Sequence, residues 1–167
     1  MITLTMPAYS VYTVHSSGVV TAAAATGEQN LAAIPIPAGF LGTSGQIRLS
    51  FCFTNNTNSN TKTLIVRMST TSAAVSGGYA IMAANQTTNQ TYTGTLFINN
   101  TSATTQQITN ALGTFAATAN VPAAGAIDTG AVSYININCN KVTDGADSVV
   151  LVAWTLEAFK GGVTYSG

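Results

Sequence analysis

The sequence predicts an all-β protein, an antiparallel β-sandwich of jelly-roll-like class. Short segments of alternating or continuous apolar residues recur at intervals of about 10 residues, with turn-forming residues between them. The 167 residues include 15 Gly, which suit turns and bulges, while segments that favour a helix are short and few. A chain of this length can bury a substantial core. We therefore expect a single β-sandwich domain over residues 1–167, with residues 1–10 as a loose N-terminal arm.

The clearest strand spans residues 46–54, where apolar and polar residues alternate. One face of this strand would carry Ile47, Leu49, Phe51 and Phe53. The Asn-rich link over residues 55–60 suits a tight connection, because Asn tolerates left-handed backbone angles. A second strand follows over residues 62–68. We predict that segments 46–54 and 62–68 pair as a β-hairpin.

Seven further segments have the pattern of strands: residues 10–15, 30–36, 79–83, 91–99, 106–109, 131–138 and 148–159. The last of these starts with apolar residues on both faces and then alternates, which predicts a central strand that is covered on both sides and emerges toward its end. A helix of one or two turns is the weaker alternative for residues 21–25 and 106–115. The apolar segment up to Ala25 is either an arm that reaches a neighbouring molecule or an ordinary first pair of strands.

Charged residues make up only 6% of the chain, against roughly 25% in an ordinary soluble domain. Five Lys and Arg balance five Asp and Glu, so uncharged polar residues must cover much of the surface. A net charge near zero favours association, which suits a repeated part of a larger assembly. The basic residues form no cluster, which argues against a nucleic-acid partner. We expect no membrane span, because no apolar run reaches about 18 residues, and residues 1–6 lack the pattern of a secretory signal.

Candidate catalytic residues are few. His15 is the only histidine, and the two serines that follow it are neighbours in sequence alone. A nucleophile needs a base and an orienting group, and no Gly-x-Ser-x-Gly motif links His15 to Asp128, Asp144 or Asp147. A glycosidase would need a carboxylate pair, but Asp144 and Asp147 lie in a predicted loop, where acidic residues commonly cap turns. We therefore predict no catalytic residues and a protein that is not an enzyme.

Metal and cofactor sites are not predicted either. Residues 141–145 resemble part of an oxygen-ligand loop, but Ca²⁺ usually requires several carboxylates. The glycine-rich segments 39–45 and 125–130 lack the Lys-Ser/Thr of a phosphate loop. Alternation places Cys52 away from its phenylalanine neighbours and Cys139 with the isoleucines of its strand. Two free thiols are the favoured interpretation, and a disulfide is the alternative.

Aromatic residues offer one further kind of site. Trp154 lies in a strand with apolar neighbours in phase, which favours a place in the core over a platform for stacking sugars. Tyr79, Tyr92 and Tyr165 would be candidates for glycan binding if they are exposed.

A more specific pattern covers residues 27–49 and 60–68. It consists of a Gly-Glu pair (27–28), an Ile-Pro-Ala-Gly turn (36–39), a Leu-Gly…Gly link (41–45), an apolar-Arg-apolar strand start (47–49), and an Asn-rich turn with Lys-Thr (62–63) before a strand that ends near Arg67. This pattern resembles a β-sandwich module that recurs in structural proteins of tailed bacteriophages. Pro37 would end its strand because it cannot donate to a ladder, and Gly39 and Gly42 would permit the turn.

The resemblance implies a virion protein without enzymatic activity: a capsid decoration or cement protein, or a small head-spike protein on the particle surface. It implies a homotrimer that contacts other virion proteins such as the major capsid protein, and assembly in the cytoplasm of the bacterial host. Arg48 and Arg67 would pair with Glu28, Glu157 or a neighbouring subunit. The alternative is a carbohydrate-binding receptor-recognition module of a phage tail fibre, with a host surface glycan as its partner, because jelly rolls host both capsid and lectin domains. A small hydrolase is the least favoured hypothesis.

Overall fold

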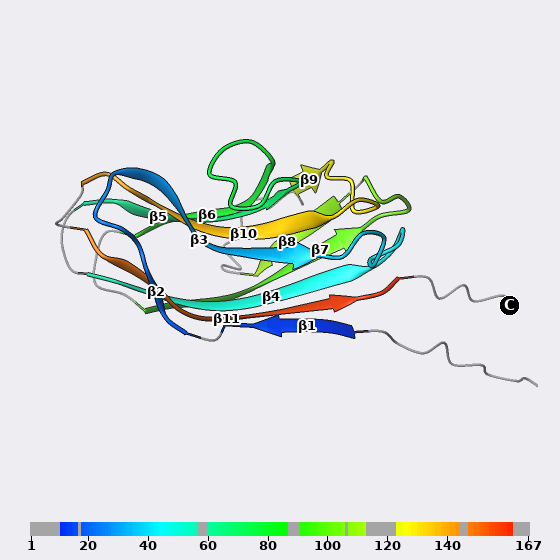
Figure 1. Cartoon of the computed structure of the whole chain (residues 1–167), viewed down its shortest axis with the longest axis horizontal. Coiled ribbons are helices and arrows are strands. Elements are labelled where there is room, and N and C mark those ends of the chain that lie inside the picture. The colour runs from blue at the N-terminus through cyan, green and yellow to red at the C-terminus, as the bar shows by residue number, and fades with distance from the viewer. Residues whose placement is uncertain are drawn as a thin grey trace, which may run out of the picture.

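A computed structural model of the chain describes residues 11–16, 18–56, 60–86, 91–105, 107–112, 123–143 and 147–161. These residues form two antiparallel sheets that pack face to face (Figure 1). The seven-stranded sheet contains β1 (Val11–His15), β2 (Val20–Thr21), β4 (Gln46–Asn55), β7 (Thr91–Asn100), β8 (Gln107–Leu112), β9 (Ala123–Gly125) and β11 (Val149–Phe159). The four-stranded sheet contains β3 (Gly27–Ile36), β5 (Lys62–Ser69), β6 (Tyr79–Gln86) and β10 (Ser133–Lys141).

The strand pairs are nested along the chain. Strand β1 pairs with β11, β3 with β10, β4 with β7, and β5 with β6. Successive pairs lie alternately in the seven-stranded and the four-stranded sheet. This winding, an antiparallel ribbon rolled into two sheets, is that of a jelly roll. The predicted fold class, an all-β antiparallel sandwich of jelly-roll type, is therefore confirmed.

Each segment predicted as a strand overlaps an observed strand, whereas the short strands β2 and β9 were not predicted. Neither helix alternative occurs in the described residues, because residues 21–25 contain the end of β2 and residues 107–112 form β8. From Val11 onward, the segment up to Ala25 provides the first pair of strands, both of which pair with β11. The predicted arm over residues 1–10 lies outside the described residues.

The predicted hairpin of residues 46–54 with 62–68 is wrong. Strand β4 pairs with β11 and β7, whereas β5 pairs with β10 and β6 in the other sheet. The link between them crosses from one sheet to the other, and the buried Lys62 ammonium donates to the carbonyl oxygens of Asn56 (3.4 Å) and Asn60 (3.0 Å). An Asn-rich link fits a hairpin and a crossover equally well, so the pattern could not reveal the pairing.

The core lies between the inward faces of the sheets. Ile47, Leu49, Phe51 and Phe53 of β4 are all buried there, as the alternation predicted. The Phe51 ring stacks on Tyr92 with 6.0 Å between ring centroids. It also lies over Gly94, its cross-strand partner on β7, where an added Cβ would come within 2.7 Å of the ring. Gly94 therefore makes room for the largest aromatic cluster of the core.

Strand β11 is central in its sheet, but only one of its faces lies in the core. The register shifts between Leu151 and Ala153, so the inward residues change from Leu151 to Leu156 and Ala158. Trp154 pairs with Phe51 and packs against the core, as predicted, although the bulge places it out of phase with the preceding valines. The outward residues keep partial exposure, so the prediction of a strand covered on both sides is wrong.

One end of the sandwich is tied by buried amides. Asn100 donates to Gly42 O and to the Thr129 hydroxyl, each at 2.7 Å. Gln107 donates to the side-chain oxygen of Asn100 at 3.0 Å and to Ile127 O at 2.9 Å. These contacts join the loops that follow β3, β7 and β9. The backbone of Gly42 has a φ of 60°, and Gly39 in the same loop has a φ of 66°, as the predicted turn requires.

Candidate functional site

The described residues form no catalytic site around His15. His15 is exposed at the end of β1, opposite Thr155 of β11. The hydroxyl of Ser16 accepts a hydrogen bond from the backbone N–H of Trp154 at 3.1 Å, so it binds the end of β1 to β11. Ser17 lies outside the described residues.

The acidic residues that the structure describes lie apart. Glu28 is on β3 and Glu157 on β11, in different sheets. Asp128 accepts a hydrogen bond from Gly130 N at 2.8 Å in the loop before β10, whereas Asp147 lies after β10, at the other end of that strand. Asp144 lies outside the described residues. Among the described acids, the arrangement brings no two together for acid–base chemistry.

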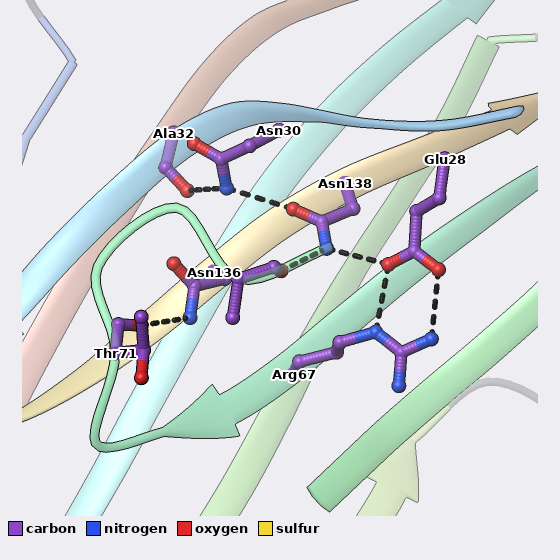
Figure 2. Close-up of polar contacts among 8 residues, drawn as sticks. Glu28, Asn30, Ala32, Arg67, Thr71, Asn136 and Asn138 are labelled. Carbon is purple, nitrogen blue, oxygen red and sulfur yellow. Dashed lines mark hydrogen bonds and ion pairs between the residues drawn. The ribbon is translucent and has the colours of Figure 1, made fainter. Parts of the chain in front are cut away.

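A polar network lies on the outer face of the four-stranded sheet (Figure 2). Arg67 on β5 donates to both carboxylate oxygens of Glu28 on β3, from Nε and from Nη2, each at 2.7 Å. Asn138 on β10, the strand between them, donates to Glu28 at 2.6 Å and accepts from Asn30 at 2.7 Å. The Gly-Glu pair and the terminal arginine of the phage-like pattern are therefore in direct contact. The expected pairing of Arg67 with Glu28 is confirmed.

The loop of residues 70–78 lies over the asparagine side of this network, beside Asn136 and Asn138 (Figure 2). Asn138 donates to Ala74 O at 2.8 Å, and Asn136 donates to Thr71 O at 3.2 Å. Both asparagines are fully buried. The loop turns through positive φ at Gly77 and Gly78, where glycine permits it, and also at Ala73, where a left-handed backbone is uncommon. The two asparagine side chains thus hold the 70–78 loop against the outer face of this sheet.

The ion pair on the covered face alters the titration of both partners. Burial opposes ionisation of Glu28, but hydrogen bonds from Arg67 and Asn138 and the charge of Arg67 outweigh it, so the pKa of Glu28 lies below its ordinary value. The hydrogen bond to Glu28 raises the pKa of Arg67. Both groups are therefore held in their charged forms, and the pair has a structural role.

A second ion pair lies on the outer face of the seven-stranded sheet. Arg48 of β4 contacts Glu157, its cross-strand partner on β11, through Nε at 2.5 Å and through Nη2. The Arg48 side chain is 43% exposed and that of Glu157 25% exposed, against 18% and 14% for Arg67 and Glu28. Of the partners left open for Arg48, the structure shows Glu157. Because the predicted hairpin does not form, Arg48 and Arg67 lie in different sheets.

Two buried lysines occupy the end of the sandwich where the oxygen-ligand loop was considered. Lys62 and Asp147 are fully buried, with 3.7 Å between Nζ and Oδ1. Lys141 donates to Ala23 O at 2.5 Å and to Asp147 O at 3.1 Å, and Asp147 accepts from Thr143 N at 3.1 Å. Ammonium groups thus bind carbonyl and carboxylate oxygens of the kind that Ca²⁺ uses. The described residues hold no group of three metal-ligating side chains.

The cysteines are free and lie in different sheets. Cys139 of β10 is buried in the core, and burial raises the pKa of its thiol to about 11. Cys52 of β4 is partly exposed and points outward, as the alternation predicted. Burial and the raised pKa make Cys139 unreactive, whereas a thiol reagent can reach the partly exposed Cys52.

The described aromatic residues that were considered for glycan binding do not form an exposed platform. Tyr79, Tyr92 and Trp154 are partly buried and pack against the core. Tyr79 also lies close to Gly125, where an added Cβ would come within 2.7 Å of its ring. Tyr165, the third tyrosine considered for glycans, lies outside the described residues.

The buried asparagines and lysines were not predicted as functional or structural groups. The alternation Ile135-Asn136-Ile137-Asn138 did signal one apolar and one polar face of β10. The two asparagines of the polar face are buried because the 70–78 loop lies over them. No local pattern in the sequence predicts the position of this loop. No signal in the sequence predicts that Lys62 is buried, because lysine side chains are rarely buried unless they are paired.

No protein-family model and no curated protein sequence matches this chain. A structure of infectious bursal disease virus, Gx strain, resembles it with a TM-score of 0.48 and 13% identity, over 94% of this chain and 33% of that one. A honeybee sacbrood virus structure has a TM-score of 0.37 and 15% identity, over 89% and 72%. The basic lectin of winged bean, solved with Tn-antigen, has a TM-score of 0.38 and 8% identity, over 91% and 100%. The chain spans about a third of the infectious bursal disease virus chain. The described residues include no helix long and apolar enough to cross a bilayer.

Proposed function

We propose that this chain is a non-enzymatic structural protein of a bacteriophage virion. In this proposal it is a capsid decoration or cement protein, or a small head-spike protein, that assembles as a homotrimer on the particle surface. Its partners are its own copies and other virion proteins such as the major capsid protein, and it assembles in the cytoplasm of the bacterial host.

The observation that carries the proposal is the position of the phage-like pattern in the fold. Residues 27–49 and 60–68 span β3, the start of β4 and most of β5. The Gly-Glu and arginine positions of the pattern meet as the Glu28–Arg67 ion pair. Because separated parts of the pattern are in contact, the pattern describes a local structure. A similarity of composition alone would not require such a contact. The jelly-roll winding supports the proposal, because this fold recurs in capsid proteins.

The surface chemistry agrees with a part that packs against copies of itself. Ten charged side chains in 167 residues leave few groups that would repel a neighbour. Of these ten, the structure pairs Arg67 with Glu28 and Arg48 with Glu157, and buries Lys62 beside Asp147.

Immunogold electron microscopy tests the proposal on particles produced by the genome that encodes this chain. Antibody raised against the purified protein is expected to label the head surface at many positions. Particles that contain none of the protein would overturn the proposal, and labelling confined to the tail tip would favour a receptor-binding module instead. A glycan array with the purified chain then tests that alternative, for which the partly buried tyrosines offer little support.

A further inference from the structure

The two sheets differ in how much of their outer faces stays accessible. We call the outward residues of the seven-stranded sheet the open face: the even-numbered residues of 46–54 on β4, and the odd-numbered residues of 11–15 on β1, 91–99 on β7 and 155–159 on β11. Even in the middle of this sheet, Ser50, Cys52 and Thr54 keep partial exposure. The corresponding central residues of the other sheet, Asn136 and Asn138, have an exposure of 0%.

The charge of the open face suits a neutral partner. Its only cation and anion among the Lys, Arg, Asp and Glu side chains are Arg48 and Glu157, which neutralise each other. Nucleic acid would find no cluster of basic residues to neutralise its phosphates there. A second copy of the chain presents the same neutral surface, so two copies meet without net repulsion, and the 43% exposed Arg48 side chain can donate to polar groups of a neighbouring copy.

The edge of the open face lacks the features that prevent association. Strand β1 forms one edge of its sheet, contains no Lys or Pro, and exposes 48% of Val11. Val11 pairs with the partly exposed Phe159. The edge strand of the other sheet, β3, contains Pro35, whereas β1 contains neither Pro nor Lys. Proteins commonly block exposed edges with Lys, Pro or bulges, so an edge strand without Lys or Pro and with an exposed valine favours a contact surface.

From these observations we infer that the open face is the surface through which copies of this chain bind one another. The inference rests on the proposed function for the homotrimer and adds the surface that holds it together. Phe97 and Phe159 supply aromatic contacts beside Arg48, the residue types that dominate binding energy at interfaces. The uncharged small residues around them allow close approach of two sheets.

Two matched variants test the surface. Thr93→Glu places a carboxylate on an exposed position of the open face, and Ala83→Glu places one on an exposed strand position of β6 in the other sheet. Light scattering of the wild-type chain is expected to give three times 17.0 kDa. We expect Thr93→Glu to lower this mass threefold and Ala83→Glu to leave it unchanged. Circular dichroism of both variants confirms that they are folded.

The thiol of Cys52 gives a second readout that needs no variant, because it lies on the open face next to Thr93. Its labelling by a thiol reagent is expected to be about tenfold slower in the concentrated, associated protein than in the dissociated one. Cys139, buried in the core, stays unlabelled in both.

An associated wild type whose mass survives Thr93→Glu, with Cys52 labelled rapidly, would overturn the open face as the interface while leaving the virion proposal intact. A wild type that stays monomeric at high concentration would overturn the inference itself. Whether the protein is on particles is decided separately by the immunogold labelling.

Discussion

The two outer faces of the sandwich each contain one arginine–glutamate pair, and the pairs have opposite surroundings. Glu28 and Arg67 share Asn138 as a third partner, and Asn138 links them to the 70–78 loop. Arg48 and Glu157 lie on a face without such a loop in the described residues, and their side chains are about twice as exposed, at 43% and 25% against 18% and 14%. The same two residue types therefore serve the protein's own packing on one face and are accessible to a partner on the other.

This difference teaches where the molecule can associate. On the face beside the 70–78 loop, most polar groups of the network are hydrogen-bonded within the molecule, Asn136 Oδ1 being the exception among the described residues, so this face has little to gain from a neighbour. The outward residues of the seven-stranded sheet are mostly uncharged and keep part of their surface accessible after folding. A neighbouring molecule can still bury that surface. Among the described residues, a loop lies over the outer face of the four-stranded sheet and none is seen to bond to that of the seven-stranded sheet, which is a clear asymmetry in a chain with so few charges.

Replacing the two arginines should give the largest difference between the faces. Arg67→Met leaves the Glu28 carboxylate partly buried without its bidentate partner, and we expect it to lower the free energy of unfolding by about 2–3 kcal/mol. Arg48→Met keeps the apolar stem and removes an exposed ion pair, so its expected cost is below about 1 kcal/mol. Urea denaturation of both variants at neutral pH measures the difference. Equal costs would mean that the 70–78 loop does not distinguish the two environments.

Replacing the buried asparagines should sharpen the same comparison within the covered face. Asn138→Ala removes donors to Ala74 O and Glu28, and we expect it to destabilise the protein by about 2 kcal/mol. Asn136→Ala should cost about half as much, because Asn136 makes one bond and its Oδ1 finds no partner among the described residues.

Hydrogen exchange of the 70–78 loop provides the structural measurement for these variants. Faster exchange is expected in both, and more strongly in Asn138→Ala, because that side chain links the loop to the ion pair. If neither substitution changed the exchange, the loop would be held by contacts other than the asparagines.

Strand identity could be predicted from the sequence, because burial on one face of a sheet imposes a period of two. The inward residues of β4 follow that period without exception. Partners could not be predicted in the same way, since β4 pairs with β11 and β7, far along the chain, and not with the next strand. The hairpin error has this origin: local alternation carries no information about which strand lies alongside.

The polar sites were only half predictable. That Arg67 and Arg48 pair with Glu28 and Glu157 could be anticipated, because so few charges are available. The burial of Asn138 and Lys62 could not, because it depends on loops and strand ends that meet only after folding. Trp154 was placed correctly in the core although the bulge in β11 shifts its phase, since its size favours burial in either register.

The acid sensitivity of the covered ion pair is the smallest effect that separates the faces. Since the folded-state pKa of Glu28 lies below its ordinary value, Glu28 adds stability above its unfolded pKa and loses it as the pH falls through the folded value. One such group changes the unfolding free energy by at most about 1.4 kcal/mol per pH unit. The difference in stability between the wild type and Glu28→Gln should therefore shrink as the pH is lowered from 7 towards about 3. Glu157→Gln is the matched control, and its deficit at neutral pH should be smaller because its ion pair is more exposed to solvent. A deficit for Glu28→Gln that stayed constant with pH would mean that the carboxylate acts through shape and hydrogen bonding alone, and the contrast between a covered and an open ion pair would then rest on the arginines.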